Sequence, residues 1–225
     1  MRSPSCTARV MAERPDLPAE PGWPATASFR GVRLAPFRRR DLGAWREVRE
    51  RNRGWLSRWD ATHPPGSRWP VRSYAGMVAG NGREARAGRM LPWLVWLDRP
   101  GQRGVMAGQL TVSGITYGAA QWASLGYWVD QRWAGRGIMP TAVALATDYC
   151  LQTLGLHRVE INVRPENLPS LRVVEKLGFR YEGRRPRFLH IDGDWRDHEC
   201  FALHAEEVPD GVCRRLPPDV PRLVS

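Results

Sequence analysis

The stretch that most constrains the fold is a glycine-rich turn between an apolar segment and a long helical pattern. The turn, QRWAGRG at 131–137, follows ASLGYWVD at 123–130, which predicts a strand, and precedes IMPTAVALATDYCLQT at 138–153, which predicts a helix. Such a turn exposes successive backbone N–H groups, and the helix adds its own unpaired N–H groups and the positive end of its dipole. This arrangement is typical of a site for phosphate or pyrophosphate.

Four residues of the turn favour an anion. Gly135 and Gly137 let the backbone approach the anion without a Cβ in the way, and Arg132 and Arg136 add positive charge. The P-loop pattern GxxxxGK(S/T) is absent, and so is GxGxxG after an early strand. Taken alone, R-x-x-G-x-G is equally compatible with a glycine-rich turn that binds no ligand.

The rest of the chain is typical of one mixed α/β domain. The predicted elements are a strand at 29–37, helices at 42–59 and 73–87, strands at 91–97, 105–117 and 123–130, a helix at 138–153, a strand at 157–164, a helix at 168–177 and a hairpin turning at 192–193. Residues 1–27 are interpreted as a disordered N-terminal extension, 28–208 as the domain and 209–225 as a flexible C-terminal tail.

Composition restricts the class of protein. The chain has 225 residues, of which 42% are hydrophobic and 25% charged, as expected of a soluble globular domain. No apolar run approaches the ~20 residues that span a bilayer, and the first residues lack the apolar core of a signal peptide. We therefore expect a cytoplasmic protein that makes no membrane contact. The four cysteines, Cys6, Cys150, Cys200 and Cys213, show no metal-binding spacing, which predicts free thiols and no metal.

The net charge of +11 raises the question of whether the protein binds nucleic acid. All but one of the 34 basic residues are arginine, and they are spread along the chain with one short run at 38–40. This pattern favours a solvated surface over a nucleic-acid-binding stripe, so nucleic acid is not expected as a direct ligand.

A second motif follows the next predicted strand. The segment NLPSLRVVEKLGFRYEG at 167–183, together with the glycine-rich turn before it, resembles motifs B and A of the GCN5-related N-acetyltransferase (GNAT) superfamily. The segments GYWVDQRWAGRGIMPTAVALA and HIDGDWRDHECFAL, with VRLAPFRRRDL near the start, further resemble the RimJ/RimL-type branch, which acetylates protein N-termini. The resemblance covers about residues 29–208 and implies a mixed central sheet with a splay between two parallel strands.

In this family acetyl-CoA lies in that splay, which here falls between 123–130 and 157–164. The resemblance implies that backbone groups of Tyr127, Trp128 and Val129 pair with the pantetheine arm. It also implies that the N–H groups of 132–138, which include Arg132, Gly135, Arg136, Gly137 and Ile138, hold the pyrophosphate. Asn167 would contact the pantetheine side, cap the following helix, or do both. Arg172 could reach the phosphates or belong to a solvated basic face.

The chemistry is attack of an amine on a thioester. Ser170 occupies the position where this branch carries its proposed general acid for the CoA sulfur, although serine is also common in a first helical turn. Glu160 is the candidate general base, with an ion pair to Arg158 or Arg164 as the alternative. His198 is a further candidate base beside the acceptor site, with a surface or strand-pairing role as the alternative. Trp55 and Trp59 share a predicted helix face that either lines the acceptor channel or packs in the core.

The function implied is acetyl transfer from acetyl-CoA to the N-terminal α-amine of a protein, such as a ribosomal protein, by a monomer or homodimer. Two alternatives stay open at this point. The same fold could acetylate a small amine, such as an antibiotic, a polyamine or an amino acid. The domain could also be a non-catalytic module that binds CoA or nucleic acid.

Overall fold

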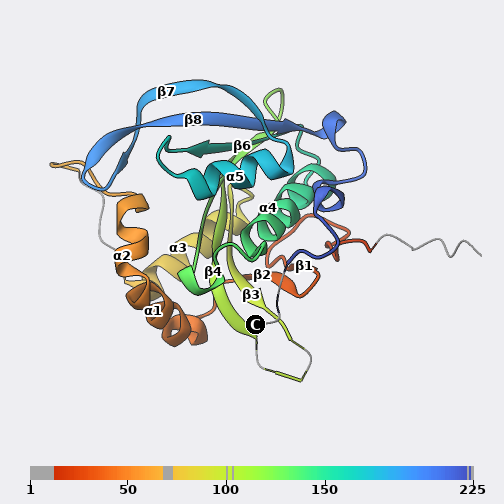
Figure 1. The fold of residues 1–225 in the computed structure, drawn as a ribbon, viewed down its shortest axis with the longest axis horizontal. Coiled ribbons are helices and arrows are strands. Elements are labelled where there is room, and N and C mark those ends of the chain that lie inside the picture. The colour runs from red at the N-terminus through yellow and green to blue at the C-terminus, as the bar shows by residue number, and fades with distance from the viewer. Residues whose placement is uncertain (1–12, 68–72, 100, 103, 222, 224–225) are drawn as a thin grey trace, which may run out of the picture.

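The computed structural model describes residues 13–67, 73–99, 101–102, 104–221 and 223, which are arranged around one twisted sheet (Figure 1). The described strands form an eight-stranded sheet in the order β1-β2-β3-β4-β5-β6-β8-β7. The strands are β1 (Ala27–Phe29), β2 (Val32–Pro36), β3 (Met90–Leu97), β4 (Val105–Thr116), β5 (Trp122–Val129), β6 (Arg158–Val163), β7 (Arg180–Ile191) and β8 (Asp194–His204). The α-helices are α1 (Leu42–Arg51), α2 (Arg53–Leu56), α3 (Tyr74–Arg86), α4 (Ile138–Asp148) and α5 (Leu168–Leu177).

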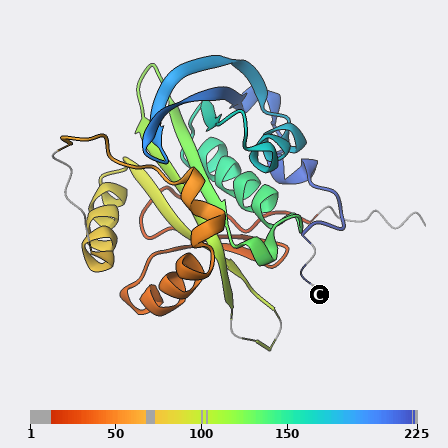
Figure 2. The same cartoon turned by 60° about the vertical axis from the view of Figure 1, so that its left-hand side comes forward.

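Helices cover both faces of the sheet, as Figures 1 and 2 show. On one face, here called the α4 face, α4 is buried along nearly its whole length and packs with α5 against the main core. On the opposite face, the α1 face, Val48 of α1 and Tyr74 of α3 pack with Met106 of β4. Because successive strand residues point to opposite faces, each strand contributes side chains to both.

The sheet is mixed, as expected. Neighbouring strands pair antiparallel except β5 and β6, which are parallel and are joined through the glycine-rich turn and α4. A π-helical turn, Tyr149–Thr153, extends α4 before the chain enters β6. The sequence prediction of one α/β domain with a parallel strand pair in a mixed sheet is therefore confirmed.

Two predicted elements are divided in the structure. The strand expected at 29–37 is the end of β1, a tight turn and then β2, because Arg30 and Gly31 both adopt positive φ angles, of 47° and 77°, that close a two-residue hairpin. The helix expected at 42–59 breaks at Asn52. The side-chain amide of Asn52 donates to the Val48 carbonyl and accepts from the Gln131 N–H, so this buried side chain ties the break to the glycine-rich turn.

The segments expected to be loose at both ends pack against the domain where the structure describes them. Ala25 and Ala27 are buried, and Trp23 contacts Trp93 of β3. Near the other end, Val212 and Val220 are buried in the same core. Contrary to the expected boundaries, residues 13–27 and 209–220 thus supply apolar surface to the core, whereas residues 1–12 lie outside the described residues.

Three further observations concern the described residues only. None of their helices is long and apolar enough to cross a membrane. They contain no group of three His, Cys, Asp or Glu side chains that could hold a metal ion. Cys150, Cys200 and Cys213 are buried free thiols, and Cys6 lies outside the described range.

Candidate active site

The parallel strands β5 and β6 separate before either ends. Their pairing stops at Leu125 opposite Ile161. β5 then continues to Val129 beside β4, and β6 continues to Val163 beside β8. The gap leaves an open backbone edge along 126–129, where an extended ligand can pair as an added strand. This is the splay that the family resemblance implied.

Of the residues expected to pair with pantetheine, Tyr127 and Val129 direct their backbone groups to this open edge. Trp128 does not, because its backbone groups face β4, where it pairs with Gln109. The carbonyl of Val129 accepts a hydrogen bond from the indole Nε1 of Trp55 on α2, at 3.2 Å. α2 thus covers the far end of the edge.

The glycine-rich turn has the backbone of an anion site. Gly135 and Gly137 have φ angles of 74° and 78°, in the left-handed region that glycine favours. Gly137 is the N-cap of α4 and offers no side chain to the helix start, and Ile138 begins the helix with a buried side chain. Within the described part of the chain, the N–H groups of Gly135, Arg136 and Gly137 have no hydrogen-bond acceptor. These free donors suit a pyrophosphate.

The two arginines of the turn differ in their partners. Arg132 binds the buried carboxylate of Asp130 through Nε and Nη2 at 3.1 and 3.0 Å, and Arg51 of α1 binds the same carboxylate at 2.8 Å. Burial alone would raise the pKa of Asp130, but the hydrogen bonds from Arg51, Asn52 and Arg132 hold this pKa below its ordinary value. Because Arg51 also pairs with Glu47 at 2.8 Å, these two arginines are balanced by two carboxylates, and Arg136 supplies the positive charge of the turn.

Arg136 lies over the ring of Trp133, 5.3 Å from the ring centre, and Arg99 contacts the same ring at 5.5 Å. This stacking anchors the stem of Arg136 and keeps its charge beside the free N–H groups.

The start of α5 faces the splay from the α4 face. Asn167 caps the helix, since its Oδ1 accepts from the Ser170 N–H at 3.3 Å, as predicted. The Ser170 hydroxyl lies 2.8 Å from the hydroxyl of Tyr127. Burial raises the pKa of Tyr127 far above its ordinary value, and the hydrogen bond with Ser170 opposes this only in part, so Tyr127 stays protonated. Arg172 lies on the exposed side of the helix, its Nε 3.4 Å from the Leu168 carbonyl.

Glu160 forms an ion pair with Arg158, the contact that the sequence left open as its alternative role. Its Oε1 binds Arg158 at 2.9 Å, and its Oε2 binds Arg185 of β7 at 3.4 Å. Glu160 is buried, so these two arginines compensate its charge. Glu160 is therefore held in a structural ion-pair network with both of its carboxylate oxygens engaged.

The α1 face of the splay is lined by aromatic and basic side chains. Trp128 of β5 lies under the guanidinium of Arg49 at 5.3 Å, and Trp45 donates to Gln109 of β4 at 3.4 Å. Trp55 and Trp59 do not share one helix face, because the helix breaks before them and Trp59 belongs to a 3-10 turn. Trp55 covers the splay, as its bond to Val129 shows.

His198 of β8 is buried on the α1 face, and its Nδ1 lies 3.0 Å from the Arg196 carbonyl. Burial lowers the pKa of His198, and nearby Arg164 lowers it further, against raising contributions from the Arg196 carbonyl, Asp197 and Glu166. His198 is therefore neutral at pH 7.

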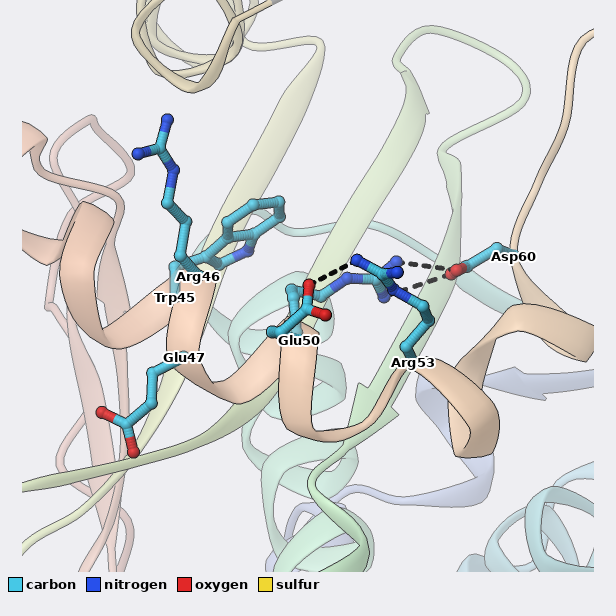
Figure 3. A pocket seen from close by; sticks show the side chains of 7 residues that line it. Trp45, Arg46, Glu47, Glu50, Arg53 and Asp60 are labelled. Atoms are coloured by element: carbon cyan, nitrogen blue, oxygen red, sulfur yellow. Dashed lines mark hydrogen bonds and ion pairs between the residues drawn. The ribbon is translucent and has the colours of Figure 1, made fainter.

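A pocket opens beside α1, and Figure 3 shows the side chains around it. It is lined by Trp45, Arg46, Glu47, Arg49, Glu50, Arg53 and Asp60. Each acidic group of the pocket is paired with an arginine: Glu47 with Arg51, Glu50 with Arg53 and Asp60 with Arg49. The pocket thus holds no carboxylate without a cationic partner.

A splayed parallel pair, followed by a turn with free N–H groups at a helix start, suits an extended ligand that carries phosphate groups, and the family resemblance of the sequence implies acetyl-CoA as that ligand. Comparison with known proteins identifies the family. Residues 32–180 match the family model of the acetyltransferase (GNAT) domain, and the chain belongs to this family. It is an acetyl-CoA-dependent N-acetyltransferase.

Three relatives carry the comparison further. The [Ribosomal protein uS5]-alanine N-acetyltransferase of Escherichia coli K12 is 32% identical over 169 residues, which are 72% of this chain and 83% of that protein. The probable N-acetyltransferase YjcK of Bacillus subtilis is 43% identical over 98 residues, so the match spans 44% of this chain and 54% of that relative. The structure of Mycobacterium smegmatis RimJ in complex with CoA-disulfide superimposes with a TM-score of 0.77 at 40% identity, over 88% of this chain and 95% of that one.

The sequence missed two features of the site. The side chain of Tyr127, expected only as a backbone contact, meets Ser170; the alternation of strand faces from Leu125 onward could have placed it on the α4 face. Arg51 reaches Asp130 from a helix 79 residues away, and no local pattern signals that contact.

Proposed function

We propose that the acceptor is the N-terminal α-amine of a protein, of which a ribosomal protein is the leading candidate. The observation that carries this is the engagement of Glu160. Because both of its oxygens are bound by arginines, Glu160 is not free to take the proton of the amine, so the described site suits an amine that loses its proton readily. An α-amine has a pKa of about 8, against about 10.4 for a lysine side chain. The E. coli relative, named for an alanine of uS5, and the RimJ structure support this choice.

The pocket beside α1 favours a peptide over a cationic small molecule. A polycationic amine needs unpaired carboxylates, and the three acids of this pocket are each bound to an arginine. A peptide instead offers backbone carbonyls to arginine donors and side chains to Trp45.

Acetyl-CoA fits the features described for the splay. The free N–H groups of Gly135, Arg136 and Gly137 would hold its pyrophosphate, with Arg132 and Arg136 adding charge. The open edge at Tyr127 would pair with its pantetheine arm. When bound, acetyl-CoA supplies the acetyl thioester. Ser170 would then protonate the departing sulfur, held in place by the hydroxyl of Tyr127.

The test is turnover of acetyl-CoA with short peptides that begin with Ala, Ser, Thr or Met, followed by mass spectrometry of the products. We expect one added acetyl group on the α-amine. The control is the same peptide with a blocked α-amine and a free lysine, which should not react. Turnover on small amines alone, with none on peptides, would contradict the proposed acceptor.

A further inference from the structure

One buried polar atom beside the splay lacks a partner. The Oδ1 of Asn162 on β6 is inaccessible to solvent and accepts no hydrogen bond from the described residues. A buried acceptor without a donor costs free energy, so such atoms are rare in folded proteins and point to a missing partner. Tyr127, Ser170 and Asn167, by contrast, all have partners within the chain.

Asn162 lies where β5 and β6 separate. Asn162 is the first residue of β6 after the last pairing with β5, at Leu125 and Ile161. Val159, Ile161 and Val163 point into the core on the α4 face, so strand alternation places Asn162 on the α1 face. Asn162 therefore lies at the opening of the splay, on the side opposite Ser170.

The neighbouring strand leaves space on that side. On β5, Gly126 shares the α1 face with Trp128, and a Cβ built at Gly126 would meet no atom within 4 Å. The site thus has an acceptor oxygen on one strand and open space on the other. A small group that carries N–H donors could occupy this space.

We propose that Asn162 binds the acceptor amine of the acetyltransferase reaction and orients its lone pair toward the thioester. The proposal rests on the function proposed above and names a residue that recognises the acceptor. Oδ1 accepts an N–H of the amine on the α1 face. The nitrogen forms its bond to the acetyl carbon while the C–S bond breaks. The proton that the nitrogen loses passes to water, and the sulfur takes its proton from Ser170 on the α4 face, which regains a proton from water.

The experiment is steady-state kinetics of Asn162→Ala and Asn162→Asp with acetyl-CoA and a peptide that begins with alanine. For Asn162→Ala we expect the KM for the peptide to rise about 10-fold or more, with the KM for acetyl-CoA unchanged. Asn162→Asp keeps an acceptor oxygen and adds a negative charge that favours the protonated amine. The rise of kcat/KM with pH should therefore occur at higher pH in this variant than in the wild type. A merely structural role would not produce this shift.

Asn81→Ala on α3 is the matched control and should leave both KM values unchanged. An unchanged peptide KM in Asn162→Ala, or an equal rise in both KM values, would overturn the proposal. If Asn162→Ala does not fold, the pH profile of Asn162→Asp decides.

If the wild type acetylates only a small amine, the proposed acceptor fails, and the same comparison with that amine tests Asn162. If the wild type turns over neither, titration of the peptide into the CoA-bound wild type and Asn162→Ala decides, and equal affinity would overturn the proposal.

Discussion

The hydroxyl oxygens of Tyr127 and Ser170 lie 2.8 Å apart and join the open end of β5 to the first turn of α5. Because burial keeps Tyr127 protonated, this contact is a hydrogen bond between two neutral hydroxyls. It fixes the rotamer of Ser170 beside the splay, where a departing sulfur would need a proton.

Ser170→Ala removes the proposed proton donor, and we expect kcat to fall about 100-fold with little change in acetyl-CoA affinity. Tyr127→Phe leaves Ser170 present but unpositioned, and it should lower kcat about 5-fold. The double variant should be no slower than Ser170→Ala alone, because both changes act through one group. Stopped-flow turnover and CoA titration measure the two effects, and additive losses in the double variant would contradict the assignment.

The two glycines of the turn should respond differently to alanine. Both have positive φ angles, which cost a residue with a Cβ about 1–2 kcal/mol. At Gly135 the added methyl meets open space, whereas at Gly137 it would clash with Cγ1 of Val220. We therefore expect Gly137→Ala to lower the melting temperature and the CoA affinity more than Gly135→Ala. Adding Val220→Ala should restore part of the loss in Gly137→Ala and none in Gly135→Ala.

Glu160→Gln tests the ion-pair role against the catalytic one. If Glu160 only compensates Arg158 and Arg185, the variant should keep its kcat and its pH profile while losing thermal stability, because two guanidinium groups lose their shared carboxylate. Turnover at several pH values and a thermal melt separate the two roles. A large fall in kcat without a change in stability would assign Glu160 as the base.

His198 predicts a pH dependence of stability. Since burial lowers the pKa of His198 in the folded state, the unfolded chain binds the proton more readily. The contribution of neutral His198 to the free energy of unfolding is therefore complete above the pKa of this residue in the unfolded chain, about 6.5. It is lost as the pH falls below that value. His198→Gln should therefore reduce the decrease in unfolding free energy between pH 7 and pH 5, measured by urea denaturation. An unchanged pH dependence would contradict this reading.

The sequence predicted the backbone features of the site better than its side-chain contacts. The glycine-rich turn and the Asn167 cap depend on local pattern, whereas the parallel strand pair follows from the family resemblance, and the structure confirms all three. The hairpin turn at Arg30 was missed because its positive φ falls on a residue that rarely adopts it. The break at Asn52 was missed because it depends on the Gln131 N–H, which is distant in sequence.

The contact between Gly137 and Val220 has a consequence for the order of folding. Val220 is held in place from the other end of the chain, since Arg30 binds the Val220 carbonyl at 2.9 Å and the Pro217 carbonyl at 2.7 Å. Three segments far apart in sequence must therefore meet before the surroundings of the turn are complete. Contacts of such large sequence separation form late because loop closure opposes them. A nascent chain that has not reached residue 220 would thus have the strands and helices of the fold but an unsupported turn, and affinity for coenzyme A should mature only after synthesis has passed that point.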